Sequence, residues 1–152
     1  MTYVLILFII ALALAPLSHF VPSKRQRRIA HLREYAAVNG LFVEFRTLPD
    51  TASRVAKSAA SPGGDIIYYG KRLPPRRGSP VERGSWVCDD EGWRGLDRRT
   101  PVPPSLLQLP AGILAASVEE ASCGIYWQEP GSEACVEQIR QVLEAWSGVL
   151  LD

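Results

Sequence analysis

An uninterrupted apolar stretch near the N-terminus constrains this chain more than any other feature. Tyr3 to Val21 spans nineteen residues without a formal charge. A helix of that length rises roughly 28 Å, close to the ~30 Å hydrocarbon core of a bilayer. A core helix of a water-soluble domain carries polar positions on one face, and Tyr3 to Ala15 has none. The sequence therefore predicts a transmembrane anchor over residues 1–22.

The same stretch allows a second interpretation, a cleaved signal peptide. Ala13-Leu14-Ala15 has the small-x-small pattern of a cleavage site after a short apolar core. Against this, no Lys or Arg precedes the apolar run, and cleavage after Ala15 would leave Pro16 at the new N-terminus. We expect an uncleaved anchor and keep the signal peptide as the alternative.

Basic residues that follow the apolar stretch predict its orientation. Residues 22–40 contain five of them against one acidic residue, Glu34. Because basic segments beside a span stay in the cytoplasm, we expect a short N-terminus outside and residues 22–152 inside. We also expect these side chains to contact the anionic headgroups of the lipid bilayer. This predicted membrane-surface site consists of Lys24, Arg25, Arg27, Arg28 and Arg33.

The basic residues belong to a predicted juxtamembrane helix over residues 23–40. Ser23 is a suitable N-cap, because its hydroxyl can accept a free backbone N–H of the first turn. Asn39-Gly40 can supply the left-handed turn that ends a helix.

The net charge of +1 conceals a gradient along the chain. Residues 41–100 contain 11 basic and 8 acidic residues, whereas residues 101–152 contain Arg140 against 7 acidic residues. A positive membrane-proximal half suits a domain that stands on an anionic leaflet. We expect no nucleic-acid partner, because no basic face is interleaved with aromatic residues.

The residues that usually carry catalysis or bind metal are scarce. The only histidines, His19 and His31, lie in or beside the predicted anchor, and no phosphate-binding glycine loop is present. Three cysteines, Cys88, Cys123 and Cys135, lack CxxC spacing, and in a reducing cytoplasm they are most simply small buried side chains. We expect no enzyme, no catalytic residue, no cofactor and no metal site.

Residues 41–152 are predicted to form one cytoplasmic α+β domain, an antiparallel sheet of four to six strands covered by a C-terminal helix. The apolar and β-branched runs predict strands, and the Pro and Gly clusters predict the connections. The last helix has its apolar residues on one face and is expected to end at Gly148. The expected elements are a strand over 41–48, a short helix over 50–60, a strand over 65–70, a loop over 71–85, a hairpin over 85–96, a helical turn within 101–110, a hairpin of strands 113–118 and 123–128, and a helix over 133–146.

Four tryptophans lie in or near these elements. We expect them to supply much of the core, and the alternative is an aromatic binding groove. They are Trp86, Trp93, Trp127 and Trp146.

The apolar span, the flank from Pro22 to Arg28 and the final strand–strand–helix resemble small single-span inner-membrane proteins of gamma-proteobacteria. Some of those proteins are labelled as YajC-like accessory subunits of the preprotein translocase. The YajC likeness covers about residues 3–48, and the region from Trp86 to Trp146 lies outside it. The resemblance implies an inner-membrane location and, less directly, a role as an accessory subunit.

Taken together, these features predict a non-enzymatic, single-pass membrane protein. Its cytoplasmic domain would bind or scaffold another protein, with a membrane protein complex as the expected partner. The alternative is a membrane-tethered ligand-binding or regulatory domain that uses a tryptophan-lined pocket.

Overall fold

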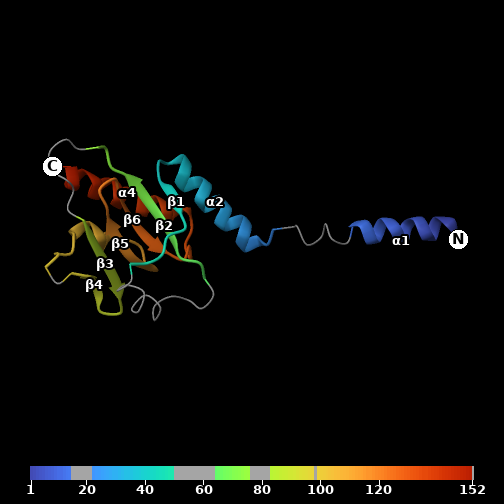
Figure 1. The fold of residues 1–152 in the computed structure, drawn as a ribbon, viewed down its shortest axis with the longest axis horizontal. Coiled ribbons are helices and arrows are strands. Elements are labelled where there is room, and N and C mark those ends of the chain that lie inside the picture. The colour runs from blue at the N-terminus through green and yellow to red at the C-terminus, as the bar shows by residue number, and fades with distance from the viewer. Residues whose placement is uncertain (15–21, 50–63, 76–82, 98, 152) are drawn as a thin grey trace. The chain divides into compact units, whose positions relative to one another are not determined.

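A computed structural model describes residues 1–14, 22–49, 64–75, 83–97 and 99–151. The chain forms two compact units, Met1–His31 and Leu32–Asp152. The second unit is an α+β domain that contains a six-stranded antiparallel sheet and a C-terminal helix, as predicted (Figure 1).

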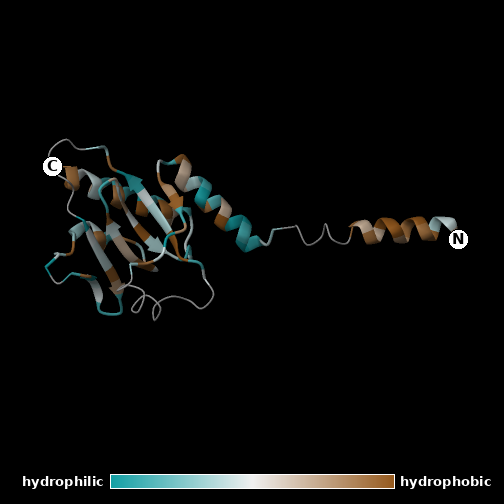
Figure 2. Cartoon of the chain, viewed as in Figure 1, coloured by the Kyte–Doolittle hydropathy of each residue, from teal (hydrophilic) through white to brown (hydrophobic). Residues whose placement is uncertain are grey.

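The first helix, α1, spans Thr2–Leu14 and leaves every one of its side chains exposed. In Figure 2 it is hydrophobic along nearly its whole length. Among the described helices, none combines the length and the apolar character that crossing a bilayer requires. The predicted anchor continues to Val21, and residues 15–21 lie outside the described residues.

The second helix, α2, spans Lys24–Val38 and confirms the predicted helix. Ser23 and Gln26 form a reciprocal capping box: the Gln26 N–H donates to Ser23 Oγ at 3.2 Å, and the Ser23 N–H donates to Gln26 Oε1 at 2.8 Å. At the other end Gly40 adopts a positive φ of 82°, and the Leu41 N–H donates to the carbonyl of Ala36 at 3.0 Å. These bonds satisfy backbone groups that a helix end leaves unpaired.

The sheet has the order β1-β2-β6-β5-β3-β4, and each pair of neighbours is antiparallel. Its centre is the β5–β6 hairpin, which was predicted, and β2 pairs with the outer side of β6. The strand bounds are β1 Phe42–Glu44, β2 Ile67–Arg72, β3 Gly84–Asp89, β4 Gly92–Gly95, β5 Ile113–Val118 and β6 Ser122–Trp127.

One face of the sheet packs against the last helix, α4, which spans Glu133–Leu151 (Figure 1). Alternation along the strands sends Tyr69, Ile125 and Trp127 into this main core, where they meet the apolar stripe of α4. The opposite face has its own smaller apolar cluster, which contains Tyr68 and Tyr126. The sheet is therefore buried on both sides at its centre.

Several predicted boundaries need correction. The strand expected over 41–48 pairs only over Phe42–Glu44, and β2 extends to Arg72, into the predicted loop. The C-terminal helix does not end at Gly148 but continues to Leu151. The predicted helical turn is the 3-10 helix η2, Pro104–Gln108, whereas the helix expected over 50–60 lies outside the described residues.

Candidate functional site

A pocket of about 470 Å³ opens beside the last turns of α4. Trp146 and Leu150 come from α4, and Trp86 comes from β3. The loop between β4 and η2 contributes a second wall with Thr100, Pro101 and Pro103. This volume lies within the range of small-molecule sites, which are mostly apolar with a few polar groups.

Trp86 and Trp146 meet inside the molecule and form the aromatic part of the pocket. Their ring centroids are 5.4 Å apart with an interplanar angle of 69°, an edge-to-face arrangement. The Trp86 indole N–H donates to the carbonyl oxygen of Pro101 at 2.9 Å, which holds the loop against the ring. Glycine at position 84 leaves room for this ring, because a Cβ there would lie 2.5 Å from it and the ring would have to shift.

Two charged side chains are among the described residues that line the pocket, and both are cationic, Arg83 and Arg99. Arg83 pairs with Glu120 at 3.1 Å, and both side chains of that pair are largely exposed. Within the described part of the chain Arg99 forms no ion pair, and the Asp97 carboxylate instead accepts the backbone N–H of Arg99 at 3.2 Å. The pocket therefore combines an apolar floor with a positive rim.

Of the four tryptophans singled out in the sequence, the structure brings two together in this pocket. Trp127 lies deep in the main core, edge-to-face with Tyr69 at 5.2 Å. Trp93 is half-buried on β4, opposite Cys88. Core packing thus accounts for Trp127, and the buried rings of Trp86 and Trp146 both pack in the core and line the pocket.

Sequence reasoning missed the remaining pocket residues. Arg83 and Arg99 stand in or next to segments that were interpreted as loops, and nothing in their spacing indicates that they converge. The only local signal is the pair of prolines, Pro101 and Pro103, which favours an ordered, extended loop.

The predicted membrane-surface residues divide into two groups. Lys24, Arg25, Arg27 and Arg28 are exposed on the first two turns of α2. Arg33, in contrast, donates from Nε and Nη2 to the two carboxylate oxygens of Glu129, at 2.8 and 2.6 Å. Its guanidinium is thus engaged within the second unit.

Glu129 is the buried partner in this contact, with 2% of its side chain exposed. It also accepts the Tyr69 hydroxyl at 2.8 Å, and its φ of 54° lies in the left-handed region. Burial, followed by the hydrogen bond to Glu129, raises the pKa of Tyr69 well above its usual range. The hydrogen bond to Glu129 likewise raises the pKa of Arg33. The cluster ties α2 to the turn that follows β6.

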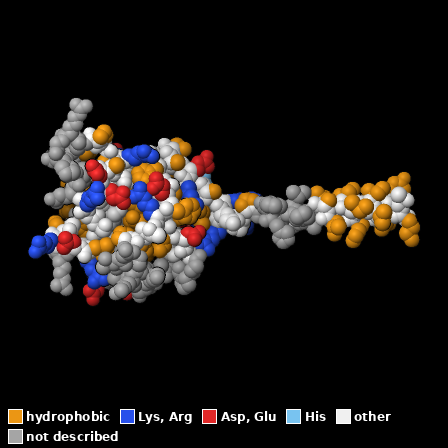
Figure 3. Space-filling model, viewed as in Figure 1, with side chains coloured by type: hydrophobic (Ala, Val, Ile, Leu, Met, Phe, Trp, Pro, Cys, Tyr) orange, Lys and Arg blue, Asp and Glu red, His pale blue; other side chains and the backbone are white. Residues whose placement is uncertain are grey.

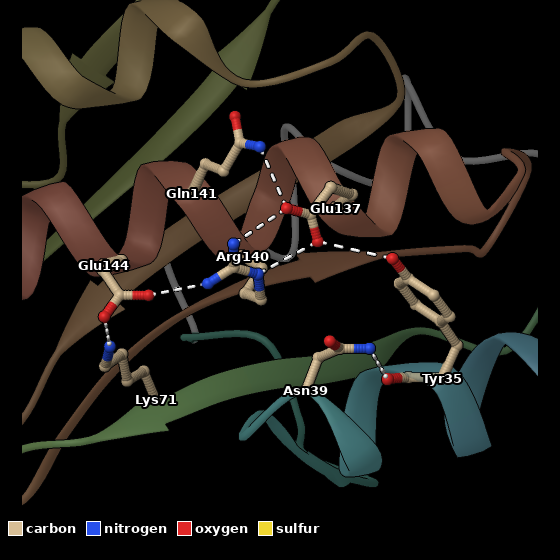
Figure 4. Close-up of polar contacts among 7 residues, drawn as sticks. All are labelled: Tyr35, Asn39, Lys71, Glu137, Arg140, Gln141 and Glu144. Carbon is tan, nitrogen blue, oxygen red and sulfur yellow. Dashed lines mark hydrogen bonds and ion pairs between the residues drawn. The ribbon is translucent and has the colours of Figure 1, made fainter.

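A second polar cluster lies on the outer side of α4 (Figure 4). Arg140 donates to Glu137 at 2.8 and 3.0 Å and to Glu144 at 2.7 Å, and Lys71 of β2 also pairs with Glu144 at 2.9 Å. Tyr35 donates to Glu137 at 3.4 Å. The bonds from Arg140 and Gln141 lower the pKa of Glu137 to about 2. On the face drawn in Figure 3, acidic and basic side chains of the domain lie side by side in the same manner.

The described residues contain no group of three His, Cys, Asp or Glu side chains placed to hold a metal ion. Cys88, Cys123 and Cys135 are free thiols. Burial raises the pKa of Cys123 to about 12, so this thiol is a poor nucleophile near neutral pH.

Comparison of the chain with known proteins finds no match among family models, curated proteins or solved structures. The exposed apolar helix α1, the tryptophan pocket and the charged clusters are therefore the observations from which a function can be inferred.

Proposed function

We propose that the chain is a non-enzymatic, single-pass protein of the bacterial inner membrane. Its N-terminus lies outside, and residues 41–152 form a cytoplasmic domain that binds or scaffolds another protein. The partner is a membrane protein complex, in which the chain serves as an accessory subunit in the manner of YajC-like proteins.

The exposure of α1 is the observation that carries this proposal. Nine Val, Leu, Ile and Phe side chains of this helix are exposed by 47% to 68%. Full burial of such a side chain in an apolar environment is favoured over water by a transfer free energy of about 1.5–3 kcal/mol. For nine partly exposed side chains, the cost of staying in water is on the order of 10 kcal/mol. Lipid removes that cost if the helix continues through the residues that follow Leu14 to form the anchor.

The four exposed cations of α2 support the orientation. Next to an anionic leaflet each contributes about 1 kcal/mol, and such residues resist translocation. None of the four forms an ion pair among the described residues. They are Lys24, Arg25, Arg27 and Arg28.

Reporter fusions test the orientation. A C-terminal fusion to alkaline phosphatase should be inactive, and a fusion to green fluorescent protein should fluoresce. Charge reversal of Arg25, Arg27 and Arg28 should make part of the phosphatase active. Charge reversal of Arg72, Arg83 and Arg94 is the matched control. These residues are far from the apolar stretch in the sequence, so their reversal should leave the phosphatase inactive. An active phosphatase on the unaltered chain would overturn the orientation.

Recovery of a partner tests the scaffold role. The tagged full chain is isolated in mild detergent and its companions are identified by mass spectrometry. We expect one membrane complex in stoichiometric amount. A chain whose residues 1–22 are replaced by an unrelated single span is the control. If the cytoplasmic domain makes the contact, the control chain still recovers the complex. If the control chain fails to recover the complex, the contact belongs to the anchor instead.

The pocket favours a second candidate function, a membrane-tethered ligand-binding or regulatory domain. The specific observation is the meeting of Trp86 and Trp146 at a cavity of about 470 Å³ with a cationic rim. A scaffold surface does not require such a cavity. Ligand binding at these two rings is the measurement that decides this candidate.

A further inference from the structure

We propose that the tryptophan pocket binds a small amphipathic carboxylate, a molecule with an aryl or short alkyl body and one anionic end. The inference rests on the second candidate function above and names the class of ligand for that site.

The apolar body would lie against the inner part of the pocket. Trp86 and Trp146 are held edge-to-face, so a ligand meets rings that are already ordered and loses little side-chain entropy on binding. Leu150 and the two prolines complete an apolar lining. Aromatic rings of this kind contribute large contact areas and favour flat or slender apolar groups.

The carboxylate would lie at the rim, where Arg83 and Arg99 are the charged lining residues. Arginine matches a carboxylate with two parallel N–H donors. Thr100, which also lines the pocket, can offer a hydroxyl. Among the residues that the structure describes, none of those lining the pocket is acidic.

Two features oppose an anion, and both are weaker than the arginines. The C-terminal end of α4 carries a partial negative charge of about half a unit, against two full positive charges at the rim. Glu120 competes for Arg83, but their ion pair is exposed on both sides, at 75% and 71%, and such pairs are weak. Among the described residues, the charges at the rim therefore favour a negative group.

The test compares 4-phenylbutyrate with 4-phenylbutyramide, which has the same phenylpropyl body and a neutral carboxamide in place of the carboxylate. The full chain is labelled with 5-fluorotryptophan and placed in phosphatidylcholine nanodiscs, and binding is followed by fluorine NMR. We expect the signals of Trp86 and Trp146 to shift and those of Trp93 and Trp127 to stay. The carboxylate should bind about five- to tenfold more tightly than the amide.

Variants identify the side chains that favour the carboxylate over the amide. Arg83→Gln and Arg99→Gln should each lower the preference for the carboxylate about two- to threefold and leave amide binding unchanged. Arg94→Gln is the matched control, because Arg94 is exposed on β4, pairs with Asp89 and does not line the pocket. A loss of preference in the control equal to that in the rim variants would overturn the assignment to Arg83 and Arg99.

The two ways of failing are distinguishable. If both compounds shift Trp86 and Trp146 with equal affinity, the anionic class is wrong and the ligand-binding function stands. If neither compound shifts these signals at about 10 mM, well above a millimolar Kd, both the class and the pocket function are wrong.

Discussion

Among the ion pairs described in the domain, the buried contact between Arg33 and Glu129 should cost the most stability when one partner is removed. Arg33→Met keeps an unbranched apolar stem but removes both donors to Glu129. Among the described residues, the carboxylate, 2% exposed, would then retain the Tyr69 hydroxyl as its one side-chain donor. Breaking a buried pair costs about 3–5 kcal/mol, and because 30% of the Arg33 side chain is exposed, we expect about 2–4 kcal/mol.

Arg140→Met is the matched control for this variant. Arg140 makes more side-chain hydrogen bonds than Arg33, and the two arginines are similarly exposed, at 28% and 30%. Its partners, however, are exposed by 31% and 57%, so water can replace the lost donors. We expect a cost of at most about 1 kcal/mol.

The assay is urea unfolding of the full chain in a mild detergent, followed by tryptophan fluorescence. Trp127 reports on this region, because its ring lies 5.2 Å from that of Tyr69. The double variant Arg33→Met/Glu129→Met removes the orphaned charge as well, and its cost should be about 2 kcal/mol less than the sum of the single variants. The burial argument is refuted if Arg140→Met costs as much as Arg33→Met, or if the two single costs add.

Three further results are expected. Burial raises the pKa of Tyr68 from 10.0 to about 12. The unfolded chain therefore releases this proton first, and Tyr68 contributes a fall of about 1.4 kcal/mol per pH unit to the free energy of unfolding between pH 10 and 12. Tyr69 and Cys123, whose pKa values are also raised, add to the decline, so Tyr68→Phe should make the slope in urea titrations shallower by the Tyr68 contribution without abolishing it. Gly124→Ala places a Cβ against the Tyr68 ring and 2.5 Å from the Tyr69 carbonyl oxygen, so it should cost about 1–3 kcal/mol, whereas Gly148→Ala in α4 meets nothing within 4 Å and should add up to about 1 kcal/mol. Cys123 should react with a maleimide only after denaturation, and rapid labelling of the native thiol would contradict its burial.

Local sequence patterns predicted the elements of the domain because each carries its own signal. The capping residues of α2, the turn between β3 and β4, and the apolar stripe of α4 depend on neighbours within a few positions. The strand expected over 41–48 was too long because its length does not depend on neighbours within a few positions. β1 is an edge strand, and its length is set by pairing with β2, which involves only Phe42–Glu44.

The candidate site could not be predicted in the same way, because distant segments build it. Arg33 and Glu129 are 96 positions apart, and Arg33 was assigned a local role as a surface cation. Four tryptophans were recognised as a set, but the partner of each depends on strand register and on the rotation of α4. Pairing of β3 with β5 places Trp86 opposite Ala116, and both residues belong to the same core cluster as Trp146.

The wrongly predicted end of α4 and the failure to predict Leu150 as a pocket residue have one physical cause. Gly148 was interpreted as a helix terminator, yet a glycine ends a helix only where the chain needs a positive φ, and Gly148 is not among the positive-φ glycines. The helix instead continues to Leu151, since Leu150 follows Trp146 by four positions and so lies on the same buried face. That additional turn supplies one wall of the pocket. Packing of the apolar stripe therefore overrides the local preference of one glycine, and the same packing creates the cavity between α4 and the loop that holds Pro101.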